Sequence, residues 1–281
     1  MCEFCTEHGE GRKWYLEMKN YAGVLLHEQL TAEQQKVVGT GTRLEWGRLF
    51  YQYFVMPALT GIAPALPGSS PPQSPPTVEQ IVAANKVEHF GQVLPIEDVE
   101  KVIDLVDSIT RMPCGCRFRY TGLTDQRYCF GVGMDKLGVL GTYPEPGAAL
   151  EVLDKEEAKR LFRRYDEEGL MHSVWTGVTP YVVGLCNCDG DCGAYRGYIQ
   201  KRGPQSFFRA EYLCQVDHDL CNGCRSCLAQ CQFGSMVYSS SREKVSINPQ
   251  LCFGCGVCRA ACPAEAISLV PRKTSVAAEI W

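Results

Sequence analysis

Two closely spaced cysteine runs constrain the fold of this chain more than any other feature of its sequence. Both runs have the spacing Cys-x2-Cys-x2-Cys-x3-Cys, and their members are Cys221, Cys224, Cys227 and Cys231, then Cys252, Cys255, Cys258 and Cys262. Four thiolates within eleven residues allow a short loop to place three sulfurs on one iron–sulfur cube while the fourth points elsewhere. Zinc motifs instead separate two pairs of ligands by a dozen or more residues. The runs therefore predict a pair of [4Fe-4S] clusters.

Residues 212–272 resemble a bacterial-type ferredoxin that holds two [4Fe-4S] clusters. Gln232 departs from the family pattern, which has a proline at this position as the second run does at Pro263. In this family the fourth cysteine of each run serves the other cluster. The resemblance therefore implies a first cluster bound by Cys221, Cys224, Cys227 and Cys262, and a second cluster bound by Cys252, Cys255, Cys258 and Cys231. It also implies transfer of single electrons at low potential.

The composition of the chain indicates the compartment in which such clusters would work and excludes some classes of partner. The chain has 17 cysteines, an odd count, and residues 1–8 lack the basic and apolar regions of an export signal, so a secreted disulfide scaffold is not expected. The apolar stretch 49–66 is interrupted by Gln52, Pro57, Gly61 and Pro64, so no transmembrane helix is expected. A net charge of -4 offers no basic surface for nucleic acid. We expect a reduced, cytoplasmic protein.

A second set of cysteines lies upstream of the two runs. Its members are Cys114, Cys116, Cys129, Cys186, Cys188 and Cys192. Cysteines two apart in an extended segment point to the same face, so each Cys-x-Cys pair could offer two sulfurs to one metal centre. These residues are candidates for a third cluster, and packing as small buried side chains is the alternative.

The segments around these cysteines resemble the upstream domain of ferredoxin-fused iron–sulfur proteins from anaerobic microbes. The resemblance rests on Pro-Cys114-x-Cys116-Arg, on the segment that ends in His172, and on Leu-Cys186-Asn-Cys188. In that group the last segment often has more cysteines, whereas this chain has Asp189 and Asp191 there. The resemblance leaves open which four of the six cysteines are ligands.

A weaker metal motif stands at the N-terminus. Cys2, Cys5 and His8 form half of a zinc or iron site, which Cys214, His27 or a partner chain would have to complete with a further ligand. Counting thiols permits a bolder scheme, in which Cys2 and Cys5 join the six upstream cysteines to bind two more [4Fe-4S] clusters, making four in all. Zinc at the N-terminal site is the other open alternative.

The predicted fold class is α+β. A C-terminal ferredoxin-like domain with two clusters follows a mixed α/β metal-binding domain and N-terminal helices. The expected segments are an N-terminal helical segment at 1–66, a proline-rich linker at 67–76, a cysteine-rich domain at 77–209, the ferredoxin domain at 210–272 and a tail at 273–281.

Hydrophobic spacing predicts several individual elements. Helices are expected over residues 12–30, from Ile96 to just before Pro113, and from 155 to 168 between an Asp154 N-cap and a Gly169 C-cap. A strand is expected at 181–185, directly before the cysteines at 186 and 188. A hairpin loop is expected around Ser239 to Ser241, between the two cysteine runs.

The pattern predicts an electron-transfer subunit that serves a larger hetero-oligomeric oxidoreductase in anaerobic metabolism. Candidate anchors for redox protein partners are Trp14, Tyr15, Tyr51, Tyr53 and Phe54, with ordinary core packing as the alternative. A second hypothesis is a reductase with a catalytic metal, or a cluster with an open coordination position, in the middle domain. A third is a redox sensor or scaffold with structural clusters.

Overall fold

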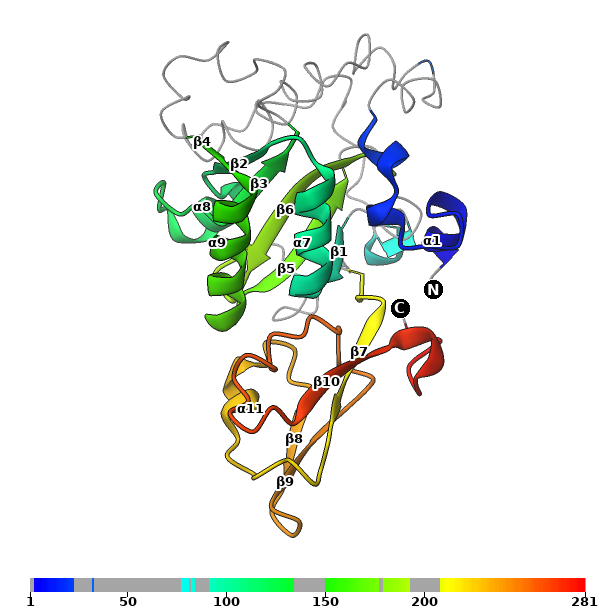
Figure 1. Ribbon diagram of the computed structural model, residues 1–281, viewed down its shortest axis with the longest axis vertical. Coiled ribbons are helices and arrows are strands. Elements are labelled where there is room, and N and C mark those ends of the chain that lie inside the picture. The colour runs from blue at the N-terminus through cyan, green and yellow to red at the C-terminus, as the bar shows by residue number, and fades with distance from the viewer. Residues whose placement is uncertain are drawn as a thin grey trace.

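The computed structural model describes residues 3–22, 32, 77–80, 82–83, 91–133, 150–176, 179–192 and 208–280. Helices and strands are mixed along the chain, as the α+β prediction requires. Figure 1 shows a unit built on one sheet and, at the opposite end, a unit of short strands and loops. The proline-rich linker lies outside the described residues, as do Cys2, Tyr51, Tyr53 and Phe54.

A six-stranded sheet forms the larger unit. Its strand order is β1-β5-β6-β3-β2-β4, and every neighbouring pair is antiparallel. The strands are β1 (Gly91–Leu94), β2 (Ile109–Met112), β3 (Cys129–Val132), β4 (Glu151–Leu153), β5 (Met171–Thr176) and β6 (Val182–Cys188). The strand expected at 181–185 is confirmed as β6, and its C-terminal end carries Cys186 and Cys188.

Two helices cover one face of this sheet (Figure 1). In α9 (Lys155–Glu167), the Asp154 carboxylate accepts a hydrogen bond from the Glu157 N–H at 2.7 Å, which confirms the predicted N-cap. The helix is followed by Gly169 at φ +86°, a conformation that glycine adopts without strain. The other helix, α7 (Ile96–Leu105), packs against α9 through the buried hydrophobic core.

The expectation that the helix from Ile96 reaches almost to Pro113 is wrong. The helix ends at Leu105, and β2 then pairs with β3 on one side and with β4 on the other. Ile109 and Met112 are buried in the sheet. Local spacing did not reveal this strand because its partners are distant in sequence.

The predicted helix over residues 12–30 is also wrong over its described part. The N-terminal segment forms a short helix α1 (Glu3–His8) and two 3-10 turns, η1 (Trp14–Leu16) and η2 (Met18–Tyr21). Trp14 donates a hydrogen bond to Gln92, Tyr15 donates one to Asp98 at 2.8 Å, and both aromatic side chains are fully buried. They are therefore core residues and not exposed partner anchors. Their buried contacts outweigh the helical spacing of the sequence, which explains why the predicted helix does not form.

The C-terminal unit contains two small antiparallel sheets. Strand β7 (Tyr212–Val216) pairs with β10 (Ile267–Pro271), and β8 (Met236–Ser239) pairs with β9 (Lys244–Ile247). A short helix α11 (Ser226–Gln230) follows the first cysteines, and a 3-10 turn η8 (Arg272–Thr274) follows β10. The turn between β8 and β9 confirms the predicted hairpin.

Polar contacts at the buried Asp98 join the N-terminal segment, the sheet unit and the C-terminal unit. The carboxylate of this α7 residue accepts hydrogen bonds from Lys13 and Tyr15, and Tyr212 of β7 contacts it at 3.4 Å. A second link is the Arg259 guanidinium, whose Nη2 donates to Glu97 at 2.8 Å. Among the described residues, no helix is both long and apolar enough to cross a membrane.

Candidate iron–sulfur sites

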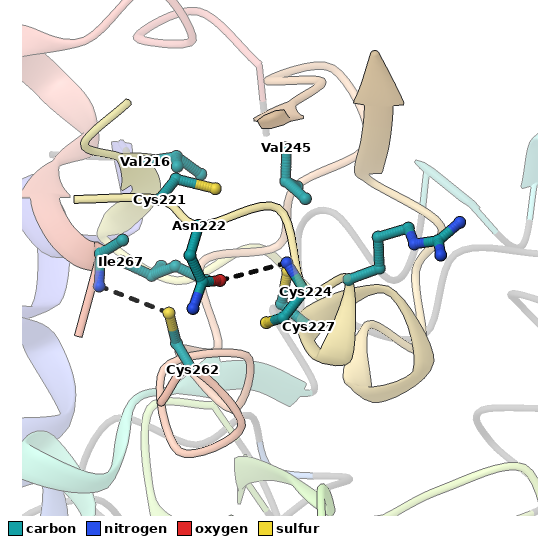
Figure 2. A pocket seen from close by; sticks show the side chains of 10 residues that line it. Val216, Cys221, Asn222, Cys224, Cys227, Val245, Cys262 and Ile267 are labelled. Carbon is teal, nitrogen blue, oxygen red and sulfur yellow. Dashed lines mark hydrogen bonds between the residues drawn. The ribbon is translucent and has the colours of Figure 1, made fainter. Parts of the chain in front are cut away.

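The first cysteine site is a pocket in the C-terminal unit. Three of its cysteines come from the first run and one from the second, and they are Cys221, Cys224, Cys227 and Cys262. Figure 2 shows these four side chains around a common space, together with apolar residues of β7, β9 and β10. The paired strands fold the two runs back on each other, which brings Cys262 to the first run despite the 34 residues between Cys227 and Cys262.

Hydrogen bonds to sulfur distinguish the members of this first site. The N–H of Ala266 donates to the Cys262 sulfur at 3.4 Å. The exposed Cys224 has a lowered pKa because the backbone N–H and the hydroxyl of Ser226 donate to its sulfur. Burial, followed by the nearby Cys262, raises the pKa of Cys227 to about 11. One side of the site therefore faces solvent while the other is enclosed.

The second cysteine site lies deeper, against the sheet unit. Cys252, Cys255 and Cys258 are all buried, and electrostatic contacts link Cys255 and Cys258 with Cys231 of the first run. The N–H of Ser235 donates to the Cys231 sulfur at 3.4 Å. Burial is the main cause of the strongly raised pKa of Cys255. These thiols would carry negative charge only if a bound cation compensated for it, as iron does.

A fifth thiol, that of Cys214, lies beside the second site and was not predicted there. Its sulfur is 3.7 Å from the Cys258 sulfur, and it also shares a hydrogen bond with Cys252. The position follows from the pairing of Cys214 on β7 with Leu269 on β10, which places the strand before the first run beside the end of the second. The sequence signal was only a cysteine seven residues before Cys221.

Two arginines bind the loop of the second site, and sequence reasoning did not identify either of them. The fully buried Arg272 donates to the carbonyl oxygens of Ala210 at 2.8 Å, Tyr212 at 2.7 Å and Cys252 at 3.1 Å. Arg209 donates to the Cys252 carbonyl at 3.0 Å, with its guanidinium 4.3 Å from the centre of the Phe253 ring. Both cations therefore lie next to a cysteine of this site.

The sheet unit gathers all the upstream cysteines into one place, which we name the six-thiol group. Its members are Cys114, Cys116, Cys129, Cys186, Cys188 and Cys192. Cys129 and Cys186 are direct neighbours across β3 and β6, with sulfurs 3.6 Å apart. The Cys114 sulfur lies 3.2 Å from that of Cys129, just before helix α8 (Gly115–Thr121). The structure therefore brings the two cysteine segments together.

The second half of the six-thiol group is centred on Cys192. Hydrogen bonds connect its thiol with those of Cys116 and Cys188. These contacts, followed by burial, strongly raise the pKa of Cys188, and the contact with Cys129 does the same for Cys114. The sulfur separations of 3.2 and 3.6 Å are far longer than the roughly 2.05 Å of a disulfide, so these cysteines are free thiols available as ligands.

Asp189 occupies a position where the upstream resemblance places a further cysteine. Its carboxylate forms an ion pair with Arg117 at 2.9 Å, and the nearly fully buried guanidinium of Arg117 lies 4.0 Å from the centre of the Tyr128 ring. A buried cation beside thiols offsets part of the charge that metal-bound thiolates would carry. Asp189 is therefore engaged in positioning Arg117.

The first and second cysteine sites and the six-thiol group all have donor sets suited to iron–sulfur clusters, because each offers cysteine sulfurs as ligands. Among the described residues, no group of three or more His, Cys, Asp or Glu side chains is arranged around a single metal ion. The sulfur contacts of 3.2 and 3.6 Å in the six-thiol group are hydrogen-bond distances between neighbouring thiols.

The N-terminal motif is only partly described. The buried Cys5 thiol donates to the Glu211 carboxylate at 3.0 Å, and His8 packs against the Phe4 ring with centroids 4.4 Å apart. Burial lowers the pKa of His8. Cys2 lies outside the described residues, so a zinc site or a fourth cluster at this end stays a prediction.

Comparison with known proteins gives a family match over the segment that contains the two cysteine runs. A family model described as a 4Fe-4S dicluster domain matches residues 220–267, which include both cysteine runs. A search of curated proteins found no match to the chain. This part of the chain is therefore similar to a two-cluster ferredoxin domain, and iron–sulfur electron transfer is the general activity that the match supports.

Proposed function

We propose that the chain is an iron–sulfur electron-transfer subunit that passes single low-potential electrons between a donor and a larger oxidoreductase. The observation that carries the proposal is the pocket in which Cys262 of the second run meets three cysteines of the first run. An arrangement with exchanged fourth ligands is the one expected of a pair of ferredoxin clusters. A [4Fe-4S] cluster bound in each site would accept and return one electron.

The residues around the two sites are suited to that role. Apolar side chains such as Val216, Val245 and Ile267 exclude water from the first site. Backbone N–H groups of Ala266 and Ser235 donate to the sulfurs of Cys262 and Cys231, and such bonds stabilise negative charge on the ligands. The exposed Cys224 edge of the first site gives a redox partner close access to it.

We extend the proposal to a third iron–sulfur centre in the six-thiol group. Six sulfurs supplied by three separate segments exceed the four that one cubane needs, so the group has enough donors without help from another chain. The subunit would then hold at least three carriers. Reduced thiols and oxygen-sensitive clusters are suited to the cytoplasm of an anaerobic cell.

The same observation argues against a catalytic metal in the middle domain. An open coordination position would be expected where fewer than four protein sulfurs are available, whereas six are gathered here. Asp189, which stands where the upstream resemblance expects a further cysteine, is paired with Arg117. No contact in the described residues specifically favours a sensor or scaffold role.

Iron analysis of variants purified without oxygen tests the proposal. Replacing Cys116, Cys188 and Cys192 together with serine leaves three thiols in the group, fewer than a cubane needs, and should remove about four irons per chain while the signals of the two ferredoxin-type clusters remain. Cys5→Ser is the matched control, because its buried thiol bonds to Glu211 and lies outside all three proposed sites. Unchanged iron in this triple serine variant would contradict the third centre. Co-purification from the native host tests subunit status, and recovery of the chain without an oxidoreductase would contradict it.

A further inference from the structure

The second cysteine site and the six-thiol group share one buried apolar cluster. Cys255 of the second site and Cys188 and Cys192 of the six-thiol group are members of it, although they come from different units. The other buried members are Val93, Met171, Ala210, Phe253 and Val257. An apolar contact of this kind keeps two centres close and excludes solvent from between them, which favours electron transfer from one to the other.

Gln232 connects the two sites more directly. It follows Cys231 in the chain, and its side-chain amide donates hydrogen bonds to the carbonyl oxygens of Gly169 and, at 3.2 Å, of Cys188. The equivalent residue after the second run is Pro263, which has no amide to donate. The first run therefore differs from its own repeat at the position that contacts the six-thiol group.

Further contacts fix the same junction. Phe233 and Phe253 stack with centroids 4.2 Å apart and an interplanar angle of 9°, so the two runs are held together beside Gln232. Gln230 donates to the Glu167 carbonyl at 3.0 Å, at the end of α9, away from the six thiols. Gln230 and Gln232 thus make similar interdomain hydrogen bonds, but only the second of these two ends on a cysteine of the group.

We propose that the second cysteine site and the six-thiol group form one coupled pair of redox centres within the chain, with Gln232 as the residue that positions them. One electron would leave the second site, which is oxidised, and enter the six-thiol centre, which is reduced, without a proton or an outside reductant. The proposal rests on the proposed function, since both sites must hold iron. It assigns the buried second site to internal transfer and the exposed first site to the outside partner.

Electron paramagnetic resonance of the full chain, reduced without oxygen, tests this coupling. In the parent protein the signal of the second cluster should be broadened further by the reduced six-thiol centre. The triple variant with serine at Cys116, Cys188 and Cys192 should give the spectrum of the two ferredoxin-type clusters alone. Gln232→Leu should shift the parent spectrum toward that of the triple serine variant while iron content is unchanged. Gln230→Leu is the matched control and should keep the parent spectrum.

Gln232→Pro provides a second variant, because Pro263 occupies the equivalent position in the repeat. It should give the same shift as Gln232→Leu. If the parent protein holds iron at the six-thiol group but its spectrum equals that of the triple serine variant, the coupling proposal is wrong and the proposed function stands. If the parent holds no iron there, both the third centre and the coupling are wrong. Equal shifts in the Gln230 and Gln232 variants would refute the positioning role.

Discussion

Replacing Arg272 with glutamine should lower the reduction potential of the second cluster. The guanidinium is fully buried and donates to the carbonyl oxygen of Cys252 at 3.1 Å. Burial lowers the pKa of Arg272 to about 10, so the side chain remains positively charged at neutral pH. A positive charge stabilises the reduced cluster, which is more negative than the oxidised one, and therefore raises the potential.

The size of the shift follows from Coulomb's law. For a unit charge at a distance on the order of 10 Å and an effective dielectric constant of about 20, the interaction is about 1.7 kcal/mol. Because reduction adds one negative charge, this corresponds to a decrease of about 70 mV in a one-electron potential. The first cluster, whose Cys224 edge is exposed to solvent, should change much less.

A potentiometric titration followed by electron paramagnetic resonance measures both potentials in one sample. Arg272→Lys is the matched control, because it retains the charge while losing the guanidinium hydrogen bonds to the backbone. The lysine variant should therefore stay closer to the parent potential than the glutamine variant does. Equal shifts in the two variants, or no shift in the glutamine variant with both clusters intact, would refute the electrostatic reasoning.

Three other changes have defined outcomes. Cys262→Ser should perturb the first cluster although it lies in the second run, which separate spectra of the two clusters would detect; loss of the second cluster alone would contradict the exchange of ligands. Gly254→Ala should reduce iron content and thermal stability, because the new Cβ would lie 2.0 Å from the Tyr212 carbonyl at φ +71°, and a parent-like melting curve and iron count would argue against this constraint. The pKa values of Cys114 and Cys188 are raised in the folded chain, so folding of the iron-free chain favours their protonated thiols. This contribution to stability should be complete below about pH 8.5, the pKa of a free cysteine, and should be lost as the pH rises further. A melting temperature that does not change with pH above about 8.5 would count against this expectation.

Local sequence signals predicted the elements whose determinants are local. The cap at Asp154 and the glycine at Gly169 each lie within two residues of the end of α9 that they define. The cysteine runs are equally local, because each short loop supplies three neighbouring sulfurs. These features were therefore accessible from spacing alone.

Features that depend on distant contacts were not accessible in this way. Trp14 and Tyr15 lie in 3-10 turns because their polar atoms bond to Gln92 and Asp98, more than 70 positions along the chain. Cys214 lies at the second site because β7 pairs with β10. Spacing predicted that two upstream segments would meet, but the pairing of β3 with β6 was needed to bring Cys129 opposite Cys186.

The most direct test of the central claim is the visible and paramagnetic resonance spectrum of the chain purified without oxygen, recorded before and after dithionite, with iron and sulfide counted. The account predicts a brown protein with at least about eight irons and eight sulfides per chain, bleaching on reduction, and signals from two interacting [4Fe-4S] clusters. A colourless protein with intact cysteines, or one that binds only zinc, would contradict it.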